Sequence, residues 1–260
     1  MKIGTRSWNF RSDLSSGRID IEAFLHIAKD IGLDGVEILA RHFSSFNLAT
    51  AERYSEIASR LGVEIVAYAL ENDFAFPAAN VRRAEIDTAC SWIKTAGLVG
   101  VPFVKIFTGD RQAAMEEATQ RAWVKEALVE CAETAAAYNT TLLVENHSTI
   151  CFTYPELMAL IKEVNHPHCQ ICPDVYNFSK LKAEEIVYEA AEKLIPLAPY
   201  SHLQFYEIDE TGRELHMDME RLVGIYRKCG YTGYLMTEWE GSADPYWFVS
   251  LTKEYLKTII

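Results

Sequence analysis

Short apolar runs alternate along the whole chain with longer segments in which apolar residues recur every three or four positions. Continuous apolar runs of this length are typical of buried strands, and the longer period is typical of amphipathic helices. Ile21, Phe24, Leu25 and Ala28, for example, share one face of a helix that Asp20 can cap. The pattern predicts that strand and helix alternate eight times.

The expected strands are Lys2–Ser7, Gly35–Leu39, Val63–Leu70, Val101–Thr108, Thr141–Glu145, Cys169–Asp174, Tyr200–Phe205 and Gly233–Glu238. The expected helices are Asp20–Ile31, Thr50–Leu61, Val81–Ala96, Ala113–Tyr138, Tyr154–Val164, Ala183–Leu194, Met219–Cys229 and Pro245–Leu256.

The strands lack strict alternation of apolar and polar residues, which indicates that both faces of the sheet are covered. The length of 260 residues is close to the ~250 typical of a (β/α)8 barrel. An open doubly wound sheet is the alternative, but no G-x-G-x-x-G follows the first strand. Because no linker rich in Pro, Gly or Ser interrupts the chain, we expect residues 1–260 to form a single TIM-barrel domain.

Charge and composition limit the classes of function. The formal charge of −12 disfavours nucleic acid as a partner, because binding phosphate backbones relies on Lys and Arg. No window approaches the ~18 apolar residues of a membrane span, and the first residues, MKIGTRSW, lack an apolar signal core. Six scattered cysteines, including the pair Cys169 and Cys172, fit buried apolar positions better than a redox or zinc site. We therefore expect a cytoplasmic protein that contacts neither nucleic acid nor membrane.

Acidic or imidazole side chains stand at the ends of the last four expected strands. They are Glu145, Asp174, His202 and Glu238. Carboxyl ends of barrel strands converge on one point, where three carboxylates would repel one another unless a divalent cation neutralised them. These ligand types suit Mn²⁺, Co²⁺, Mg²⁺ or Zn²⁺. Each residue also has a plainer interpretation, as a helix cap, a solvated carboxylate or a hydrogen-bonded core histidine. Their repetition at one height on consecutive strands favours a metal site.

The chain resembles the sugar phosphate isomerase/epimerase family, whose fold is the xylose isomerase-like barrel. The resemblance runs nearly end to end and is most specific in NDFAFP, VKIFTG, VENHS, CPDVYNF, SHLQF and GYTGYLMTEWEG. It implies that the positions of Glu145, Asp174, His202 and Glu238 hold one divalent metal ion, of which Mn²⁺ is favoured. It further implies that Glu145 and Glu238 remove and return a proton while an enediolate forms.

Other residues are weaker candidates for binding substrate. His147 follows Glu145 by two positions, although it could equally be a solvated loop residue. Asn177 stands where several relatives carry histidine, which weakens assignment to the ketose 3-epimerases.

Glu37 matches a family position near the pocket, with a buried ion pair to Arg6 or Lys105 as its alternative. Lys105 could offset the acidic ligands or meet a substrate carboxylate. Arg213 is a plausible lid cation, but the Gly-rich segment that often follows it in relatives is absent.

The sequence therefore predicts a divalent-metal-dependent sugar isomerase or epimerase acting on a small ketose or hydroxy-carbonyl compound. The alternative is a lyase of the same superfamily, either an inosose or dehydroshikimate-type dehydratase or a keto-sugar-acid decarboxylase. Cleavage of abasic DNA would call for more histidine and acidic ligands and a basic surface, and a non-catalytic sugar-binding module gains no support from an assembled ligand set. The sequence lacks an identifiable phosphate cradle, which favours an unphosphorylated substrate. We expect a homodimer or homotetramer, because aromatic residues crowd the expected carboxyl-end loops.

Overall fold

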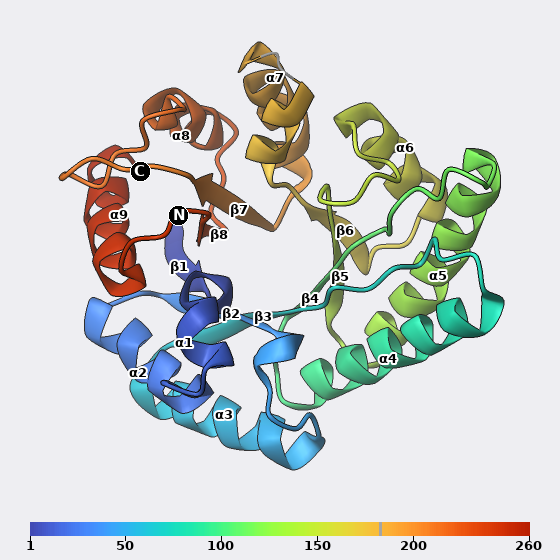
Figure 1. The fold of residues 1–260 in the computed structure, drawn as a ribbon, viewed down its shortest axis with the longest axis horizontal. Coiled ribbons are helices and arrows are strands. Elements are labelled where there is room, and N and C mark those ends of the chain that lie inside the picture. Colours follow the sequence, from blue (N-terminus) through green and yellow to red (C-terminus); the bar gives the residue numbers. More distant parts are fainter. Residues whose placement is uncertain (182–183) are drawn as a thin grey trace.

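In the computed structural model, which describes residues 1–181 and 184–260, the strands form a nearly closed barrel that the helices surround (Figure 1). The described residues contain eight strands, and every pair of neighbours is parallel. They are β1 (Lys2–Arg6), β2 (Gly35–Leu39), β3 (Glu64–Ala69), β4 (Phe103–Ile106), β5 (Thr141–Glu145), β6 (Cys169–Cys172), β7 (Tyr200–Phe205) and β8 (Tyr234–Trp239).

The longer helices follow the strands in the predicted order. They are α2 (Ile21–Ile31), α3 (Leu48–Leu61), α4 (Ala79–Leu98), α5 (Glu117–Ala137), α6 (Tyr154–Val164), α7 (Glu184–Leu194), α8 (Met219–Lys228) and α9 (Pro245–Ile259). Of the expected helix at Ala183–Leu194, the first residue lies outside the described residues. The sequence did not predict the short helical segments η1 (Ser7–Phe10), α1 (Arg11–Ser15), η2 (Ala40–His42), η3 (Val175–Leu181) and η4 (Ile195–Leu197).

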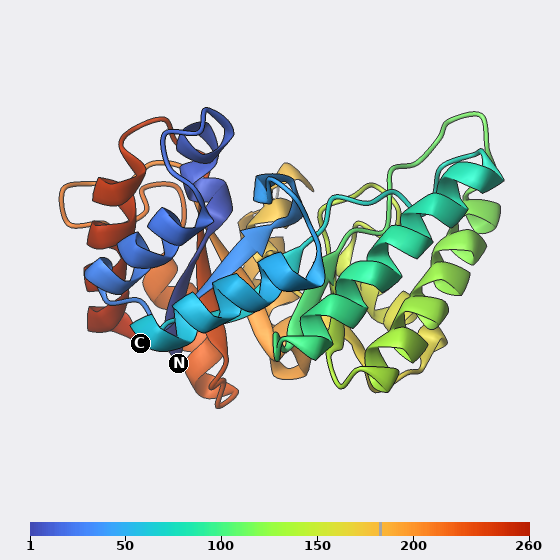
Figure 2. The same cartoon turned by 90° about the horizontal axis from the view of Figure 1, so that it is seen from below.

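The barrel has a seam between β6 and β7. The strand order is β6-β5-β4-β3-β2-β1-β8-β7, so the two outer strands of this order must meet to close the barrel. They do so through one parallel bridge between Asp174 and His202, in which the His202 N–H donates to the Pro173 carbonyl over 3.0 Å. Figure 2 shows both termini at one end of the barrel, where β1 begins. The carboxyl ends of the strands therefore lie at the opposite end.

Local sequence signals explain many of the element boundaries. The predicted cap of α2 is present, because the Asp20 carboxylate accepts from the Ala23 N–H at 2.8 Å. Gly32 then ends this helix with a φ of 77°, in the left-handed region that favours glycine.

Several predicted boundaries differ from the structure by one to four residues, and two of these differences have a clear local cause. The helix expected from Ala113 begins at Glu117, because Gln120 turns its side chain back onto the preceding loop. Its amide oxygen accepts from the Gln112 N–H at 2.8 Å and its NH₂ donates to the Met115 carbonyl at 3.2 Å. The strand expected to reach Asp174 ends at Cys172, because Pro173 has no N–H to donate to a ladder.

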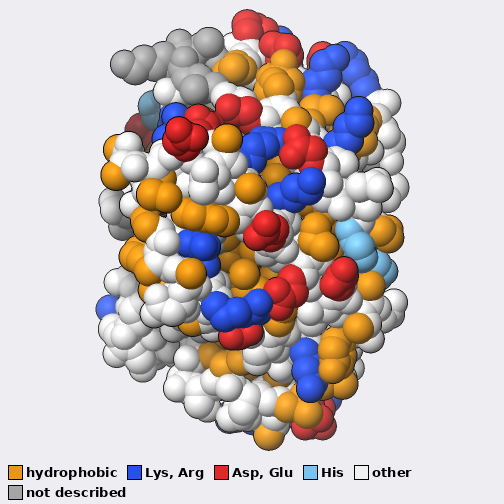
Figure 3. Space-filling view, turned by 90° about the vertical axis from the view of Figure 1, so that its right-hand side faces the viewer, with side chains coloured by type: hydrophobic (Ala, Val, Ile, Leu, Met, Phe, Trp, Pro, Cys, Tyr) orange, Lys and Arg blue, Asp and Glu red, His pale blue; other side chains and the backbone are white. Residues whose placement is uncertain are grey.

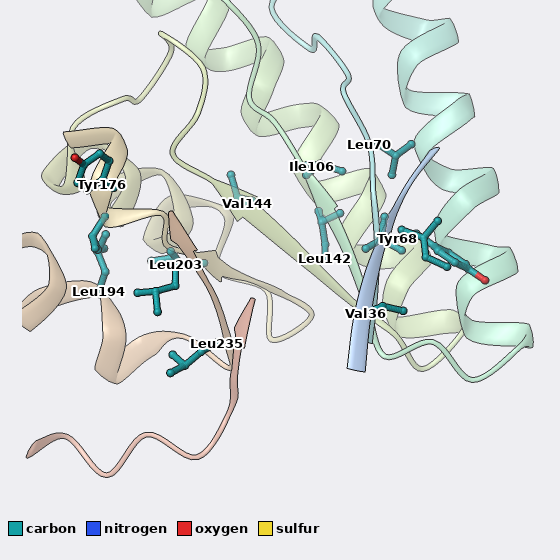
Figure 4. Packing of buried hydrophobic residues seen from close by; sticks show 14 of the residues in the cluster. Val36, Tyr68, Leu70, Ile106, Leu142, Val144, Tyr176, Leu194, Leu203 and Leu235 are labelled. Carbon is teal, nitrogen blue, oxygen red and sulfur yellow. The ribbon is translucent and has the colours of Figure 1, made fainter. Parts of the chain in front are cut away.

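The core has two parts, which the alternation of side chains along each strand separates. On β5, Leu142 and Val144 point outward and pack between the barrel and its helices (Figure 4). Leu143 points inward and packs with Tyr200, Met236 and other residues inside the barrel. The next inward position on β5 is Glu145, so the apolar interior ends in a charged layer.

The outer surface carries charges of both signs. Figure 3 shows acidic and basic side chains interspersed over one face of the molecule. Exposed ion pairs such as Arg83–Glu130 and Arg121–Glu163 link neighbouring helices, and pairs of this kind contribute little stability each. Within the described residues, no helix combines the length and apolar character needed to cross a bilayer.

The core supplies a stability test. Leu25 of α2 is fully buried between helix and barrel, so Leu25→Ala should lower the free energy of unfolding by about 2–5 kcal/mol. Leu98 at the end of α4 is 53% exposed, and Leu98→Ala serves as the matched control with a change within about 0.5 kcal/mol. Urea unfolding measures both, and equal effects of the two substitutions would contradict the described burial.

Candidate metal centre

Charged or imidazole side chains occupy inward positions near the carboxyl ends of most strands. Residues two apart on a strand face the same side, so Glu145 follows Leu143 on the inner face of β5, and Glu238 follows Met236 on that of β8. The same spacing places His202 after Tyr200 and Lys105 after Phe103. Arg6, Glu37, Lys105, Glu145, Asp174, His202 and Glu238 are between 0% and 7% exposed. We refer to these seven residues as the charged layer.

Four members of this layer form a cluster that could hold a metal ion. Glu145, Asp174, His202 and Glu238 each offer one ligand atom, and these atoms all lie within 4.8 Å of one another. The structure therefore brings together the four residues that the sequence pattern selected.

The seam between β6 and β7 fixes two of these candidate ligands. The Asn146 side chain pairs with the backbone of Asp174, donating to its carbonyl at 2.7 Å and accepting from its N–H at 2.8 Å. The Asp174 carboxylate also accepts from the Tyr176 N–H at 3.2 Å. With Pro173 bound to the His202 N–H, Asp174 and His202 are held next to each other across the seam without a regular ladder between β6 and β7.

Glu37 organises the back of the site. Its carboxylate pairs with Arg6, and its Oε2 accepts from the Tyr200 hydroxyl at 2.6 Å and faces His202 Nε2 at 2.8 Å. The buried ion pair with Arg6, the alternative interpretation of Glu37 from sequence, is thus the arrangement found. Arg6 also pairs with Glu238 through its Nη1.

The pKa values of the carboxyl groups differ with their partners. Burial would raise the pKa of Glu145, but the charge of Lys105, followed by that of His202, holds it well below its ordinary value. Burial is likewise outweighed at Glu37, where Arg6 lowers the pKa. Asp174 forms no ion pair with a cation among the described residues, and burial, followed by the charge of Glu145, raises its pKa to about 6. Burial and Arg6 oppose the charged form of His202, but the acidic groups around it, Cys172, Glu37 and Glu145, raise its pKa.

This donor set fits a divalent cation. The Nε2 of His202 is taken by Glu37, which leaves Nδ1 facing the cluster, 3.1 Å from Glu145 Oε1 and 3.5 Å from Glu238 Oε2. A carboxylate on the outer ring nitrogen is the usual way in which a metal-binding histidine is oriented. Three carboxylates and one imidazole are also a ligand set that Mn²⁺, Co²⁺, Mg²⁺ and Zn²⁺ accept.

The remaining candidates lie at different distances from the cluster. Lys105 contacts it, with its Nζ 2.7 Å from Glu145 Oε2. Asn177 is 2% exposed in η3, and its Oδ1 accepts from Lys180 while its Nδ2 is buried without a partner. His147 is exposed and stacks on Phe107 with 4.3 Å between ring centroids.

Arg213 lies away from the cluster. It is exposed in the loop between β7 and α8, where it lines a surface cleft of about 290 Å³ with Asp209, Glu214 and Asp218. Among the described residues, this cleft contains none of the four ligands. No contact among the described residues supports the predicted role of Arg213 as a lid cation.

Sequence reasoning named Arg6 only as a possible partner of Glu37, and it missed Gln204 altogether. Gln204 follows His202 by two positions on β7, pairs in register with Glu238, and has a buried Oε1 without a partner. Both residues obey the inward spacing that selected the ligands. Extending that spacing to β1 and one step further along β7 would have found them.

The comparisons with known proteins agree with this fold. The family model of the xylose isomerase-like TIM barrel matches residues 25–255, and the chain belongs to that family. One curated relative, the alpha subunit of a C-glycoside deglycosidase from Arthrobacter globiformis, is 48% identical over 50 residues. That match covers 19% of this chain and 14% of the relative's length.

Several solved structures share the fold over nearly the whole chain. An L-ribulose 3-epimerase superposes with a TM-score of 0.82 at 17% identity, covering 99% of this chain and 93% of its own. A 3-keto-D-glucoside 4-epimerase from E. coli gives 0.81 at 18% identity, covering 99% of each chain. A probable 3-DHS dehydratase from Bacillus anthracis gives 0.78 at 16% identity, covering 99% of each chain. At these identities the likeness is one of fold.

Proposed function

We propose that this protein is a divalent-metal-dependent isomerase or epimerase of a small ketose or other hydroxy-carbonyl sugar. One observation carries the proposal. Four ligands from β5, the end of β6, β7 and β8 place their donor atoms within 4.8 Å of one another in a buried layer. Mn²⁺ is the favoured ion.

The chemistry follows from what the two glutamates can do beside a cation. A bound divalent cation would polarise the substrate carbonyl and adjacent hydroxyl, which acidifies the neighbouring C–H and stabilises the enediolate. Glu145 and Glu238 come from different strands, and their carboxylate oxygens lie 3.1 Å and 3.5 Å from His202 Nδ1. One carboxylate can take the proton from carbon and the other can return one from the opposite face, which gives an epimer. Return of the proton to the neighbouring carbon gives an isomer.

Two buried polar atoms without partners are suited to bind substrate. Asn177 Nδ2 can donate a hydrogen bond and Gln204 Oε1 can accept one. A buried group left unpaired costs free energy, and a sugar that carries both hydroxyl and carbonyl oxygens can satisfy both atoms. The pair therefore supports a polyhydroxylated ligand.

Likeness to sugar epimerases supports the proposal further, since two of the solved structures described above carry that name. The likeness to a probable dehydratase favours a second candidate, a lyase that uses the same enediolate to expel water. In this candidate, His147, which stacks on Phe107, is the group proposed to assist a departing hydroxyl. The two candidates share the first step, removal of the proton from carbon.

Solvent exchange separates the candidates. The Mn²⁺-loaded protein is incubated in D₂O with a panel of ketoses, keto-acids and inososes, and the products are followed by NMR. The proposal predicts deuterium at a carbon beside a carbonyl together with a new isomer. Deuterium with loss of water or CO₂ would assign the lyase. Absence of exchange with every compound, with metal bound, would contradict the proposed function.

A further inference from the structure

Each of the two glutamates proposed to move protons is paired with a different buried cation. Lys105 Nζ lies 2.7 Å from Glu145 Oε2, and the lysine is fully buried with its ammonium 3.7 Å from the centroid of the Phe107 ring. Arg6, 4% exposed, pairs with Glu238 and with Glu37. Neither cation is a metal ligand, so their place in the layer needs another explanation.

The charges of the layer do not cancel. It holds four carboxylates against two cations, Arg6 and Lys105. With His202 neutral, as a metal ligand must be, two negative charges are left over. Buried charges without partners are costly, and one divalent cation would remove the whole excess. If both cations were absent, the excess would be four negative charges, and a single divalent ion could not balance it.

The two ion pairs also involve both of the positively charged side chains in the layer. A sugar phosphate or a sugar acid needs a cation to face its anionic group, typically an arginine fork or a lysine. Both buried cations stand in ion-pair contact with carboxylates, and in the case of Lys105 this contact is one of charge without a hydrogen bond. At the rim, Arg41 pairs with Glu71, and the exposed Lys180 donates to Asn177. Within the described part of the chain, the layer keeps no buried cation free for an anionic substrate.

We propose that Arg6 and Lys105 are positioning residues that set the charge of the site for one divalent cation and an uncharged sugar. This inference rests on the proposed function and restricts its substrate class. It excludes phosphate esters and carboxylates as the preferred substrates, and it resolves the two roles open to Lys105 in favour of offsetting the acidic ligands.

Mn²⁺ titration followed by electron paramagnetic resonance tests the charge of the layer without any substrate. In Lys105→Met a positive charge near the ion is lost, so the affinity for Mn²⁺ should rise by at least about tenfold. The metal-free variant should melt at a lower temperature than the metal-free wild type, because Glu145 is left buried without its partner. Mn²⁺ should therefore raise the melting temperature of Lys105→Met more than that of the wild type.

Two controls separate charge from other effects. Lys105→Arg keeps the charge and should bind Mn²⁺ with nearly wild-type affinity. Lys94→Met removes the charge of an exposed lysine on α4 and should leave both affinity and melting temperature unchanged. A folded Lys105→Met that binds Mn²⁺ no more tightly than the wild type would overturn the inference. A wild-type protein that binds no Mn²⁺ at all would overturn the proposed function itself, and this inference with it.

The substrate class has a test that needs no variant. The D₂O exchange assay on the wild-type protein is run with uncharged ketoses, their phosphate esters and 2-keto acids at equal concentration. The inference predicts faster exchange with the uncharged compounds. Faster exchange with a phosphate ester or a keto acid would overturn the inference while supporting the proposed function.

Discussion

Glu145→Gln and Glu238→Gln should each reduce proton exchange between substrate and solvent by about 10²–10⁴-fold, the usual contribution of a positioned acid or base. Glutamine has nearly the shape of glutamate but cannot take a proton from carbon at neutral pH. The fold should remain, because a buried acceptor stays available to Arg6 and Lys105 in each case. The rate of deuterium incorporation by NMR is the measurement, with the melting temperature as a check of folding.

Glu240→Gln is the matched control for Glu238→Gln. Glu240 lies two positions further along the chain and accepts from Trp8 Nε1 at 3.0 Å, outside the four-ligand cluster. Its substitution should leave exchange within a few-fold of wild type. Wild-type exchange in Glu145→Gln or Glu238→Gln would remove that glutamate from the proposed pair.

Asp174→Asn and His202→Ala should chiefly weaken metal binding. Loss of a group that merely orients a ligand commonly costs 10–100-fold in affinity, so loss of a ligand itself should cost at least about 100-fold. Metal content after dialysis and Mn²⁺ titration measure the effect. Exchange should return in part at high Mn²⁺ concentration, because both glutamates of the proton-transferring pair are still present.

His216→Ala is the control for His202→Ala. His216 is exposed and pairs with Glu207 at 3.1 Å in the loop that follows β7. The control should retain metal as the wild type does. If dialysed Asp174→Asn or His202→Ala keeps its metal, that residue is not a ligand.

The fold was largely readable from sequence because burial imposes two clear periods on the chain. Runs such as TLLVE in β5 place apolar residues on both faces of the sheet, and α2 places them on a single stripe. The start of α5 was not readable, because it depends on hydrogen bonds from the Gln120 side chain to its own loop. The end of β6 could have been read from Pro173, which interrupts the ladder.

The grouping of the four candidate ligands could be predicted from sequence, because the carboxyl ends of the strands converge in a barrel. Their partners were harder to find. Arg6 meets Glu238 across 232 positions in sequence, and nothing local to either residue indicates that contact. Lys105 pairs with Glu145 rather than with a substrate carboxylate. This pairing depends on the distance between β4 and β5, which the local sequence of neither strand reveals. The balance of positive and negative charges in the charged layer could therefore be determined only from the structure.

The most direct test of the account is to strip the protein with a chelator and restore one equivalent of Mn²⁺ per chain. The account predicts that proton exchange between a responsive ketose and D₂O disappears in the stripped protein and returns in proportion to bound Mn²⁺, saturating at one ion per chain. Exchange that persists in metal-free protein, or that fails to return when Mn²⁺ is shown to be bound, would contradict the claim that this cluster is a metal-dependent catalytic centre.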